Sequence, residues 1–279
     1  MIPKLLLMLA GAAMLQPAPR ILVHGGQGAA AFRPANTLPS FEYAINAGAD
    51  ALELDLVVTK DNVVVVSHDP TLAPPYCTGP RPGAVIRELT LSQLRAWDCG
   101  AIRDPSFPRQ TPVPGTRMPT LDEVFSLASR GSFDFNIETK IYPGKEHMSP
   151  APEEFARLAL EQIRKHKLEK RVILQSFDFR TLHAMRKLAP EIRLSALHWK
   201  TPKDFVAIAR EAGAQIVSPH FKLVTPEQVR AAHAAGLQVI PWTPNLPEEW
   251  DQMIAAEVDA IISDDPAGLI ARLKKRGLR

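Results

Sequence analysis

The sequence lacks the features that mark several common classes of protein. No run of apolar residues approaches the roughly 20 that a membrane-spanning helix requires, so stable membrane insertion is not expected. Lys and Arg total 33 against 30 Asp and Glu, which leaves a formal net charge of only +3, and no basic run stands out before 274–276. Because nucleic-acid-binding proteins usually concentrate positive charge on one face, a nucleic acid is not an expected partner.

Cysteine and glycine are also used sparingly. The chain has 2 cysteines and 15 glycines in 279 residues, and the glycine-rich fingerprint of a dinucleotide-binding fold is missing. What is present is a 46% hydrophobic fraction, which is enough for a full core and excludes intrinsic disorder. The length suits one large α/β domain or two small ones.

The N-terminal residues differ in character from the rest of the chain. A charged start at Lys4 precedes a short apolar stretch, 5–15, and small residues then offer cleavage sites. This pattern predicts a signal peptide over 1–18, export to the periplasm or the medium, and a folded domain over 20–279; a frayed amphipathic terminus is the alternative. In an oxidising compartment Cys77 and Cys99 would be able to pair, although two free buried thiols remain equally open.

The alternation of short β-branched runs with helical patterns predicts a mostly parallel sheet. The candidate strands are Ile21–Gly25, Ala51–Val58, Val63–Ser67, Phe133–Lys140, Val172–Ser176, Ile192–Leu197, Gln215–Ser218, Gln238–Trp242 and Asp259–Ile262. Nine strands are one too many for a closed eight-stranded barrel, so Val63–Ser67 is predicted to fold back on the second strand across a two-residue turn at Asp61–Asn62. In an antiparallel hairpin the numbers of two opposed residues always have the same sum. A turn at Asp61–Asn62 therefore places His68 opposite Asp55. The predicted fold is an α/β (β/α)₈ TIM barrel with a β-hairpin extension after the second strand; an open doubly wound sheet is the alternative.

A long proline-rich segment, Thr71–Pro119, follows this hairpin as a loop insertion with one predicted helix near Leu91–Trp97. It lies where a barrel places its active-site loops, so it is expected to cover the substrate. The alternative is a solvent-exposed insertion without a role in the site. Further helix starts are predicted from capping boxes and from prolines in a first helical turn, at Thr90, Thr120, Pro202 and Pro226.

Two of the predicted strands carry carboxylates where a barrel normally has apolar residues. In 51–57 the leucines alternate with Glu53 and Asp55, so the leucines are predicted to pack on the helices and the carboxylates to point inward. Phe133–Lys140 repeats the pattern, with Glu138 and Lys140 facing inward. Three converging carboxylates without a cysteine or histidine pair favour Ca²⁺ or Mg²⁺. The alternative is a Glu138–Lys140 ion pair, with the other two carboxylates capping loops.

His68 and Trp242 complete the candidate site. The hairpin brings His68 next to Asp55, where an imidazole with a pKa near neutrality can exchange a proton with a reacting oxygen. Trp242 ends its strand at the mouth of the barrel. Its ring either forms the floor of a substrate pocket or simply fills the end of the barrel. A divalent cation beside Lys140 would form an anion-binding site, and a phosphate group is the expected ligand.

The chain from about Ile21 to Leu273 resembles the glycerophosphodiester phosphodiesterase family. The motifs that carry the resemblance are, in order, Pro34-Ala35-Asn36-Thr37-Leu38, Gly48-Ala49-Asp50-Ala51-Leu52-Glu53-Leu54-Asp55, Thr59-Lys60-Asp61, Ser67-His68-Asp69-Pro70, Ile137-Glu138-Thr139-Lys140, Gln175-Ser176-Phe177 and Trp242-Thr243-Pro244-Asn245. The resemblance implies a TIM barrel, Ca²⁺ or Mg²⁺, and hydrolysis of glycerophosphodiesters to glycerol 3-phosphate and an alcohol. It also implies the roles of single residues, with Glu53, Asp55 and Glu138 as metal ligands, His68 as an acid/base and Lys140 as a phosphate contact.

One motif of the family is altered. Counting back from Pro34 without gaps puts Gly26, Gln27 and Gly28 where the family has His-Arg-Gly, and Ala35 where it has Glu. A histidine, an arginine and a glutamate of the family are therefore absent. His24 lies two positions earlier, on the same face of an extended strand but about 6–7 Å deeper, and is a candidate substitute.

Three functional hypotheses follow. The first is an exported, metal-dependent phosphodiesterase acting on small glycerophosphodiesters, with activity weakened or altered by Gly26, Gln27 and Ala35. The second is a catalytically inactive barrel that binds phosphodiesters or polyol phosphates. The third is a metal-dependent sugar isomerase or lyase that uses the same carboxylates.

Overall fold

A computed structural model describes residues 21–279. The predicted signal peptide, 1–18, lies outside the described residues. Eight parallel strands form the wall of a barrel, in the spatial order β10-β9-β8-β7-β6-β2-β1-β11. They are β1 Leu22–Gly25, β2 Ala51–Val58, β6 Asp134–Thr139, β7 Val172–Ser176, β8 Arg193–His198, β9 Ile216–Pro219, β10 Gln238–Val239 and β11 Ala260–Ser263. The predicted TIM barrel is confirmed.

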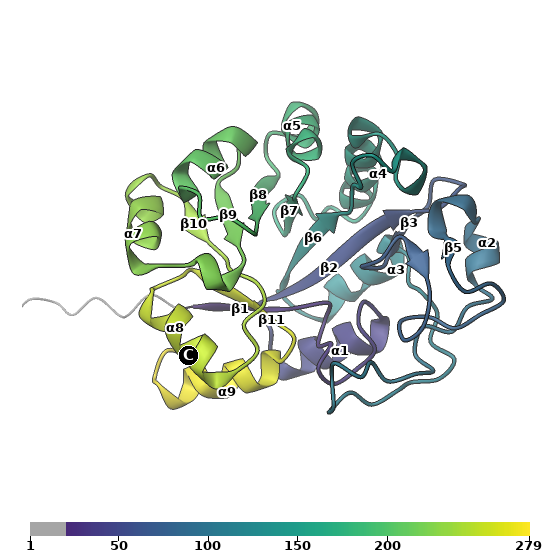
Figure 1. Ribbon diagram of the computed structural model, residues 1–279, viewed down its shortest axis with the longest axis horizontal. Helices are drawn as coiled ribbons and strands as arrows, with labels where there is room; N and C mark the ends of the chain where they lie inside the picture. The colour runs from purple at the N-terminus through teal and green to yellow at the C-terminus, as the bar shows by residue number, and fades with distance from the viewer. Residues whose placement is uncertain (1–20) are drawn as a thin grey trace, which may run out of the picture.

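The ring is completed where the last strand meets the segment around β10. The N–H of Asp259 donates to the carbonyl of Val239 at 3.1 Å, and that of Ile262 donates to Pro241 at 3.0 Å. Most helices lie outside the strands (Figure 1). They are α1 Leu38–Ala47, α3 Leu121–Phe125, α4 Pro152–Lys165, α5 Phe179–Leu188, α6 Phe205–Ala212, α7 Pro226–Ala234, α8 Pro247–Ala255 and α9 Pro266–Lys275. In the described part of the chain, no helix combines the length and the hydrophobicity that crossing a membrane requires.

The helix-start signals are confirmed with one exception. Thr90 and Thr120 each accept a hydrogen bond from the third helical N–H and form complete capping boxes. Pro226 is the first residue of α7. Pro202 does not start a helix, because α6 begins at Phe205 and the side chain of Asp204 accepts a hydrogen bond from the N–H of Ala207. The acidic N-cap fixes the start of this helix.

The predicted hairpin exists, but its register is shifted by one residue. Strand β3, Val64–Val66, runs antiparallel to β2 and pairs Leu56 with Val66. The N–H of Thr59 donates to the carbonyl of Val63 at 3.0 Å, so the loop has three residues, 60–62, and Asn62 adopts a φ of 62°. Ser67, and not His68, is therefore opposite Asp55, because a three-residue loop with a left-handed last position replaces the expected two-residue turn.

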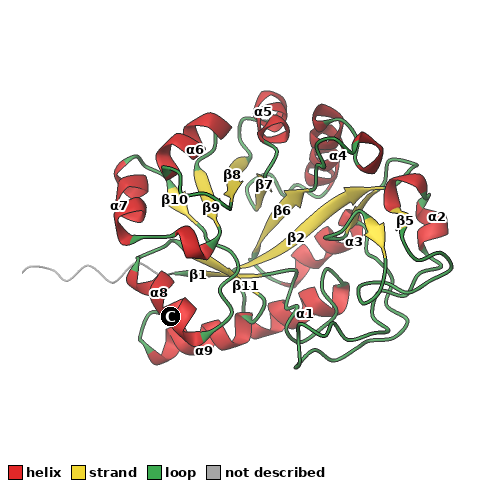
Figure 2. Cartoon of the chain, viewed as in Figure 1, coloured by secondary structure: helices red, strands yellow, loops and turns green. Residues whose placement is uncertain are grey.

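The insertion between β3 and α3 folds around a small core of its own. It contains the two-stranded pair β4 Thr71–Leu72 and β5 Ala84–Val85 and the short helix α2 Leu91–Leu94. Cys77 and Cys99 form a disulfide within it. Its buried side chains, among them Trp97, pack against Val57 and Val65 of the hairpin and form a cluster separate from the main core. Figure 2 shows the insertion as mostly loop, on one side of the barrel.

Candidate active site

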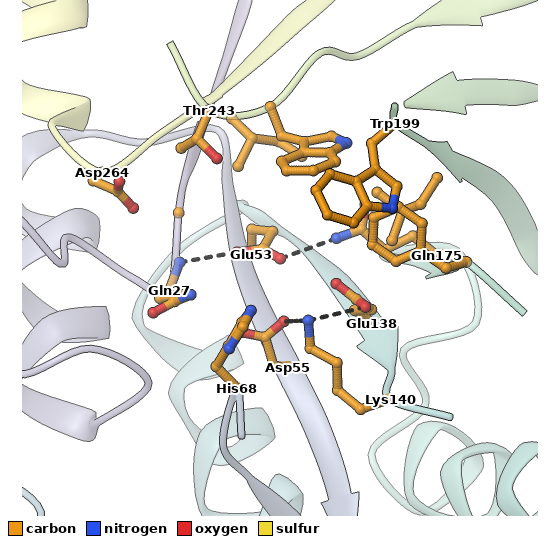
Figure 3. A pocket seen from close by; sticks show the side chains of 15 residues that line it. Gln27, Glu53, Asp55, His68, Glu138, Lys140, Gln175, Trp199, Thr243 and Asp264 are labelled. Carbon is orange, nitrogen blue, oxygen red and sulfur yellow. Dashed lines mark hydrogen bonds and ion pairs between the residues drawn. The ribbon is translucent and has the colours of Figure 1, made fainter. Parts of the chain in front are cut away.

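A cavity of about 450 Å³ opens at the carboxyl ends of the barrel strands (Figure 3). This is the end at which TIM barrels place their active sites. The residues that line it are Gly26, Gln27, Glu53, Asp55, His68, Glu138, Lys140, Gln175, Phe177, Leu197, Trp199, Trp242, Thr243, Ile262 and Asp264. All six residues predicted for the site are among them, so the structure brings the candidate ligands, the histidine, the lysine and the tryptophan to one place.

The alternation in β2 produces the inward direction of its carboxylates. The three leucines of this strand are fully buried in the main core, whereas Glu53 and Asp55 line the cavity. Strand β6 lies next to β2, and their register pairs Asp55 with Glu138. Glu53, Asp55 and Glu138 each offer an oxygen, and these oxygens all lie within 4.8 Å of one another.

Amide groups hold two of these carboxylates in place. Glu53 accepts hydrogen bonds from the backbone N–H of Gln27 at 2.9 Å and from the side chain of Gln175 at 3.0 Å. Asp55 accepts a hydrogen bond from the side chain of Asn36 at 2.8 Å. Asn36 and Gln175 lie within motifs of the sequence, but the sequence alone predicts no role for either residue. The signal for Gln175 was its place on a buried strand, where an amide requires a polar partner.

Lys140 lies between two of the carboxylates. Its Nζ is 3.0 Å from Asp55 Oδ1 and 3.0 Å from Glu138 Oε1, so the side chain is held at the carboxylate cluster. Burial alone would lower the pKa of Lys140, but the charges of Asp55 and Glu138 outweigh it and raise this pKa. Lys140 therefore stays an ammonium ion at the edge of the cavity.

One ammonium group does not balance three buried carboxylates. Burial, together with the neighbouring charge of Asp55, raises the pKa of Glu53 well above its usual value. Burial also raises the pKa of Glu138, to about 7, against the opposing effect of Lys140. The negative charge is in excess, and all the donors are carboxylate oxygens. This combination fits a hard divalent cation, which favours oxygen ligands.

His68 directly follows Ser67, whose N–H donates to the carbonyl of Asp55 at 2.9 Å, and this bond brings His68 to the cavity. Its Nδ1 lies 2.9 Å from Asp69 Oδ1. That hydrogen bond and the charge of Asp55 raise the pKa of His68 above its usual value. Within residues 21–279 no side chain or backbone group bonds its Nε2, which leaves this nitrogen for a ligand in the cavity.

His24 does not take the place of the missing family histidine. It is 2% exposed, it is not among the cavity-lining residues, and its Nδ1 lies 3.4 Å from Asn136 Nδ2 in the barrel interior. Burial lowers the pKa of His24 to about 4. The ring is therefore neutral and enclosed at neutral pH, one layer below the cavity floor.

Aromatic rings form one wall of the cavity. Trp242 donates its indole N–H to the carbonyl of Ser218 at 2.9 Å, and Phe177 meets its ring edge-on at 5.6 Å between centroids. Trp199 is 49% exposed and lines the same cavity. Sequence reasoning missed Phe177 and Trp199 as site residues, because a single aromatic at the end of a strand does not reveal which cavity it faces.

The insertion does not cover this cavity, contrary to the expectation from its position in the chain. No residue of 71–119 lines it. Tyr76 and the disulfide instead border a smaller recess that His68 and Ala35 share. The insertion lies beside the barrel, where its core packs against the hairpin and the side chain of Gln110 donates to the carbonyl of Ala30 at 2.8 Å.

Comparisons with known proteins find relatives of this chain by sequence and by fold. Residues 27–268 match the model of the glycerophosphoryl diester phosphodiesterase family. A glycerophosphodiester phosphodiesterase of Caldanaerobacter subterraneus subsp. tengcongensis is 32% identical over 248 residues, which cover 88% of this chain and 94% of the relative. A solved structure of a family member from Silicibacter pomeroyi DSS-3 is 31% identical, with a TM-score of 0.86 over 94% of this chain and 96% of that one.

A more distant structure shares the fold. The phosphodiesterase OLEI02445 of Oleispira antarctica, solved with the product sn-glycerol-3-phosphate, is 22% identical and has a TM-score of 0.78 over 91% of this chain and 97% of its own. The match with the family model spans both strands that bear the carboxylates and the hairpin that bears His68.

Proposed function

The chain belongs to the glycerophosphoryl diester phosphodiesterase family, and from this premise we propose that it hydrolyses small glycerophosphodiesters with the help of a divalent cation, Ca²⁺ or Mg²⁺. The products would be glycerol 3-phosphate and an alcohol. The observation that carries the proposal is the convergence of three carboxylate oxygens within 4.8 Å, from two neighbouring strands, in the cavity that His68 also lines. The glycerol 3-phosphate bound to the Oleispira antarctica protein supports a product of this size and charge.

Each residue has a role that its chemistry suggests. Glu53, Asp55 and Glu138 would hold the cation, which supplies Lewis-acid polarisation of the phosphoryl group. Lys140 would contribute a fixed positive charge beside the phosphate oxygens. His68, with Asp69 on Nδ1, would use Nε2 to give a proton to the leaving alcohol. A glycerol hydroxyl next to the phosphate would act as the internal nucleophile, and Trp242 would contact the alcohol moiety.

The decisive experiment is steady-state hydrolysis of glycerophosphocholine by the purified protein with Ca²⁺, with Mg²⁺ and with EDTA. We expect turnover with a cation and none with EDTA. Glu138→Gln should weaken cation binding in calorimetry by more than about 10-fold, because outer-shell changes alone cost 10–100-fold. The exposed Glu42→Gln, which removes an ion pair with Arg130, serves as the control and should bind the cation normally. Rates that stay at background with Ca²⁺ and with Mg²⁺ would contradict the proposal.

A second candidate function is a binding protein without catalysis, and the observation that favours it is the presence of Gly26, Gln27 and Ala35 in the altered motifs. The double substitution Gly26→His with Gln27→Arg separates the two functions. Turnover that appears only in the double variant would favour the binding protein, whereas turnover already present in the natural chain favours the enzyme. Product analysis separates both from an isomerase or lyase, which would cleave no phosphate ester.

We also propose that the protein is exported. The disulfide between Cys77 and Cys99 supports this proposal, because disulfides persist in oxidising compartments. Mass spectrometry of the protein made from the full chain in a bacterial host should find a mature N-terminus near residue 19 in the periplasm or medium. An intact N-terminus in the cytoplasm would contradict it.

A further inference from the structure

The loop that follows β6 begins with a turn that the sequence encodes. Tyr142-Pro143-Gly144-Lys145 has proline at the second position and glycine at the third, which are the residues that a type II β-turn prefers. The structure has this turn, because the N–H of Lys145 donates to the carbonyl of Tyr142 at 2.9 Å and Gly144 adopts a φ of 79°. The turn begins two residues after Lys140, so it fixes Tyr142 next to the site.

The side chain of Tyr142 reaches the histidine of the site. Its hydroxyl donates to the backbone carbonyl of His68 at 3.1 Å. Burial raises the pKa of Tyr142 above its usual value, the charge of Lys140 opposes this rise, and the charges of nearby carboxylates, Asp55 first, add to it. The hydroxyl therefore keeps its proton, and donates this hydrogen bond, throughout the pH range in which an enzyme works.

The other contacts of the turn 67–70 do not relate His68 to β6. Asp69 Oδ1 lies 2.9 Å from the Nδ1 of His68, but Asp69 is the next residue in the chain and moves with the histidine. The N–H of Ser67 ties the start of the turn to β2. Among the described residues outside this turn, only Tyr142 has a side chain that bonds His68 or Asp69. Its hydroxyl links the histidine to the end of β6, the strand that carries one of the three carboxylates.

We propose that Tyr142 is a positioning residue, which holds His68 where its Nε2 meets the oxygen of the leaving alcohol. The inference rests on the proposed hydrolysis of glycerophosphodiesters. The carboxylates that would fix the cation lie on β2 and β6, whereas the proton donor comes from a separate turn after β3. Proton transfer requires the two heavy atoms to be about 2.6–3.2 Å apart, so a small shift of this turn costs rate. Tyr142 does not line the cavity, so it acts through His68 and not by contact with the substrate.

The first test is Tyr142→Phe, which removes the hydroxyl and keeps the ring. With glycerophosphocholine at saturating cation, we expect kcat to fall by about 2- to 10-fold, the value of one hydrogen bond of ordinary strength, with KM and cation affinity unchanged. The control is Tyr43→Phe, because the ring of Tyr43 stacks on Phe32 at 4.9 Å between centroids and does not line the cavity. This control should keep the natural kcat.

The second test asks whether the hydroxyl acts through His68. A 4-nitrophenyl ester of glycerol 3-phosphate has a leaving group that needs no proton, so Tyr142→Phe should release 4-nitrophenolate at nearly the natural rate. In the double variant of Tyr142→Phe with His68→Gln, kcat for glycerophosphocholine should be no lower than in His68→Gln alone. An equal loss with both substrates, or a double variant in which the two losses multiply, would overturn the inference.

Hydrogen exchange supplies a readout that does not depend on turnover. The N–H of Ser67, bonded to the carbonyl of Asp55, should exchange about 2- to 10-fold faster in Tyr142→Phe, because the turn has lost one hydrogen bond. It should exchange at the natural rate in Tyr43→Phe. Unchanged exchange in Tyr142→Phe would also overturn the inference. Absence of turnover in the natural protein would instead contradict the proposed function, and the exchange experiment would still decide whether Tyr142 holds the turn.

Discussion

At the scale of single residues, a line of polar side chains runs through the barrel interior below the cavity. His24 contacts Asn136, the side chain of Asn136 donates to Gln175 at 3.1 Å, and Gln175 donates to Glu53 at 3.0 Å. Barrel interiors are normally filled by branched apolar residues. The amides here orient a carboxylate of the site, and His24 ends the line in a buried position.

The burial of His24 predicts a pH dependence of stability. Its pKa is about 4 in the folded protein against 6.5 in the unfolded chain, so between these values only the unfolded chain takes up the proton. The free energy of unfolding should therefore fall as the pH drops from about 6.5 to 4, and His24 alone should account for about 3 kcal/mol of the loss.

Urea unfolding of the natural protein and of His24→Gln across this pH range measures the effect. Gln keeps an acceptor for Asn136 but does not titrate, so its stability should decline less steeply. The stability advantage of the natural protein over His24→Gln should shrink by about 3 kcal/mol between pH 7 and pH 4. Parallel curves for the two proteins would show that His24 is protonated in the folded state.

At the scale of elements, the hairpin formed by β2 and β3 carries His68 to the cavity. Its loop ends at Asn62, whose φ of 62° is in the left-handed region. The side chain of Asn62 also accepts a hydrogen bond from Arg87 at 2.8 Å. Because side chains alternate along a strand, the length of this loop determines which residue after β3 lies at the carboxylates.

The conformation of Asn62 predicts different costs for two substitutions. Both Asn62→Ala and Asn62→Gly remove the hydrogen bond to Arg87, so the difference between them reports on the backbone alone. Alanine in the left-handed region is strained and glycine is not, so Asn62→Ala should be the less stable variant by about 1 kcal/mol. Chemical denaturation of the two variants tests this value, and equal stabilities would mean that the loop adopts another conformation.

At the scale of the whole molecule, the described residues form two main hydrophobic cores and one small cluster. The larger core fills the space between the barrel and its helices, and the smaller core lies under the insertion and includes the disulfide between Cys77 and Cys99. The third cluster joins a few residues of the barrel strands, among them Ile173 and Ile216. The carboxylate cluster belongs to barrel strands that the larger core supports. Stability of the insertion and integrity of the carboxylate cluster are therefore expected to be separable properties.

Removal of the disulfide should act on the insertion first. A cross-link that closes a loop of this length typically contributes about 3 kcal/mol. In the double variant Cys77→Ala with Cys99→Ala, limited proteolysis should cut within 71–119, while calorimetry still detects normal cation binding. Ile137→Ala, in the larger core, is the comparison and should lower the global unfolding temperature without selective cleavage of the insertion. Loss of cation binding in the disulfide variant would contradict the separation.

The sequence by itself determined the barrel and the inward direction of the site's carboxylates. Both follow from local periodicity, since the alternation of leucine with Glu53 and Asp55 requires only that the segment be a strand between helices and a barrel interior. The existence of the hairpin and the helix starts at Thr90 and Thr120 were predictable for the same reason, because each depends on residues within one turn.

Only the tertiary structure decided the rest. The one-residue shift in the hairpin depends on the conformation of Asn62, and a turn residue tolerates more than one conformation. The insertion lies beside the barrel, where its core packs on the hairpin and Gln110 bonds to a distant loop, and these partners do not signal one another in the sequence. Asp264 lies beside Gly26 because the last strand pairs with the first. Such contacts join residues far apart in the chain, so they exist only once the ring of strands has formed.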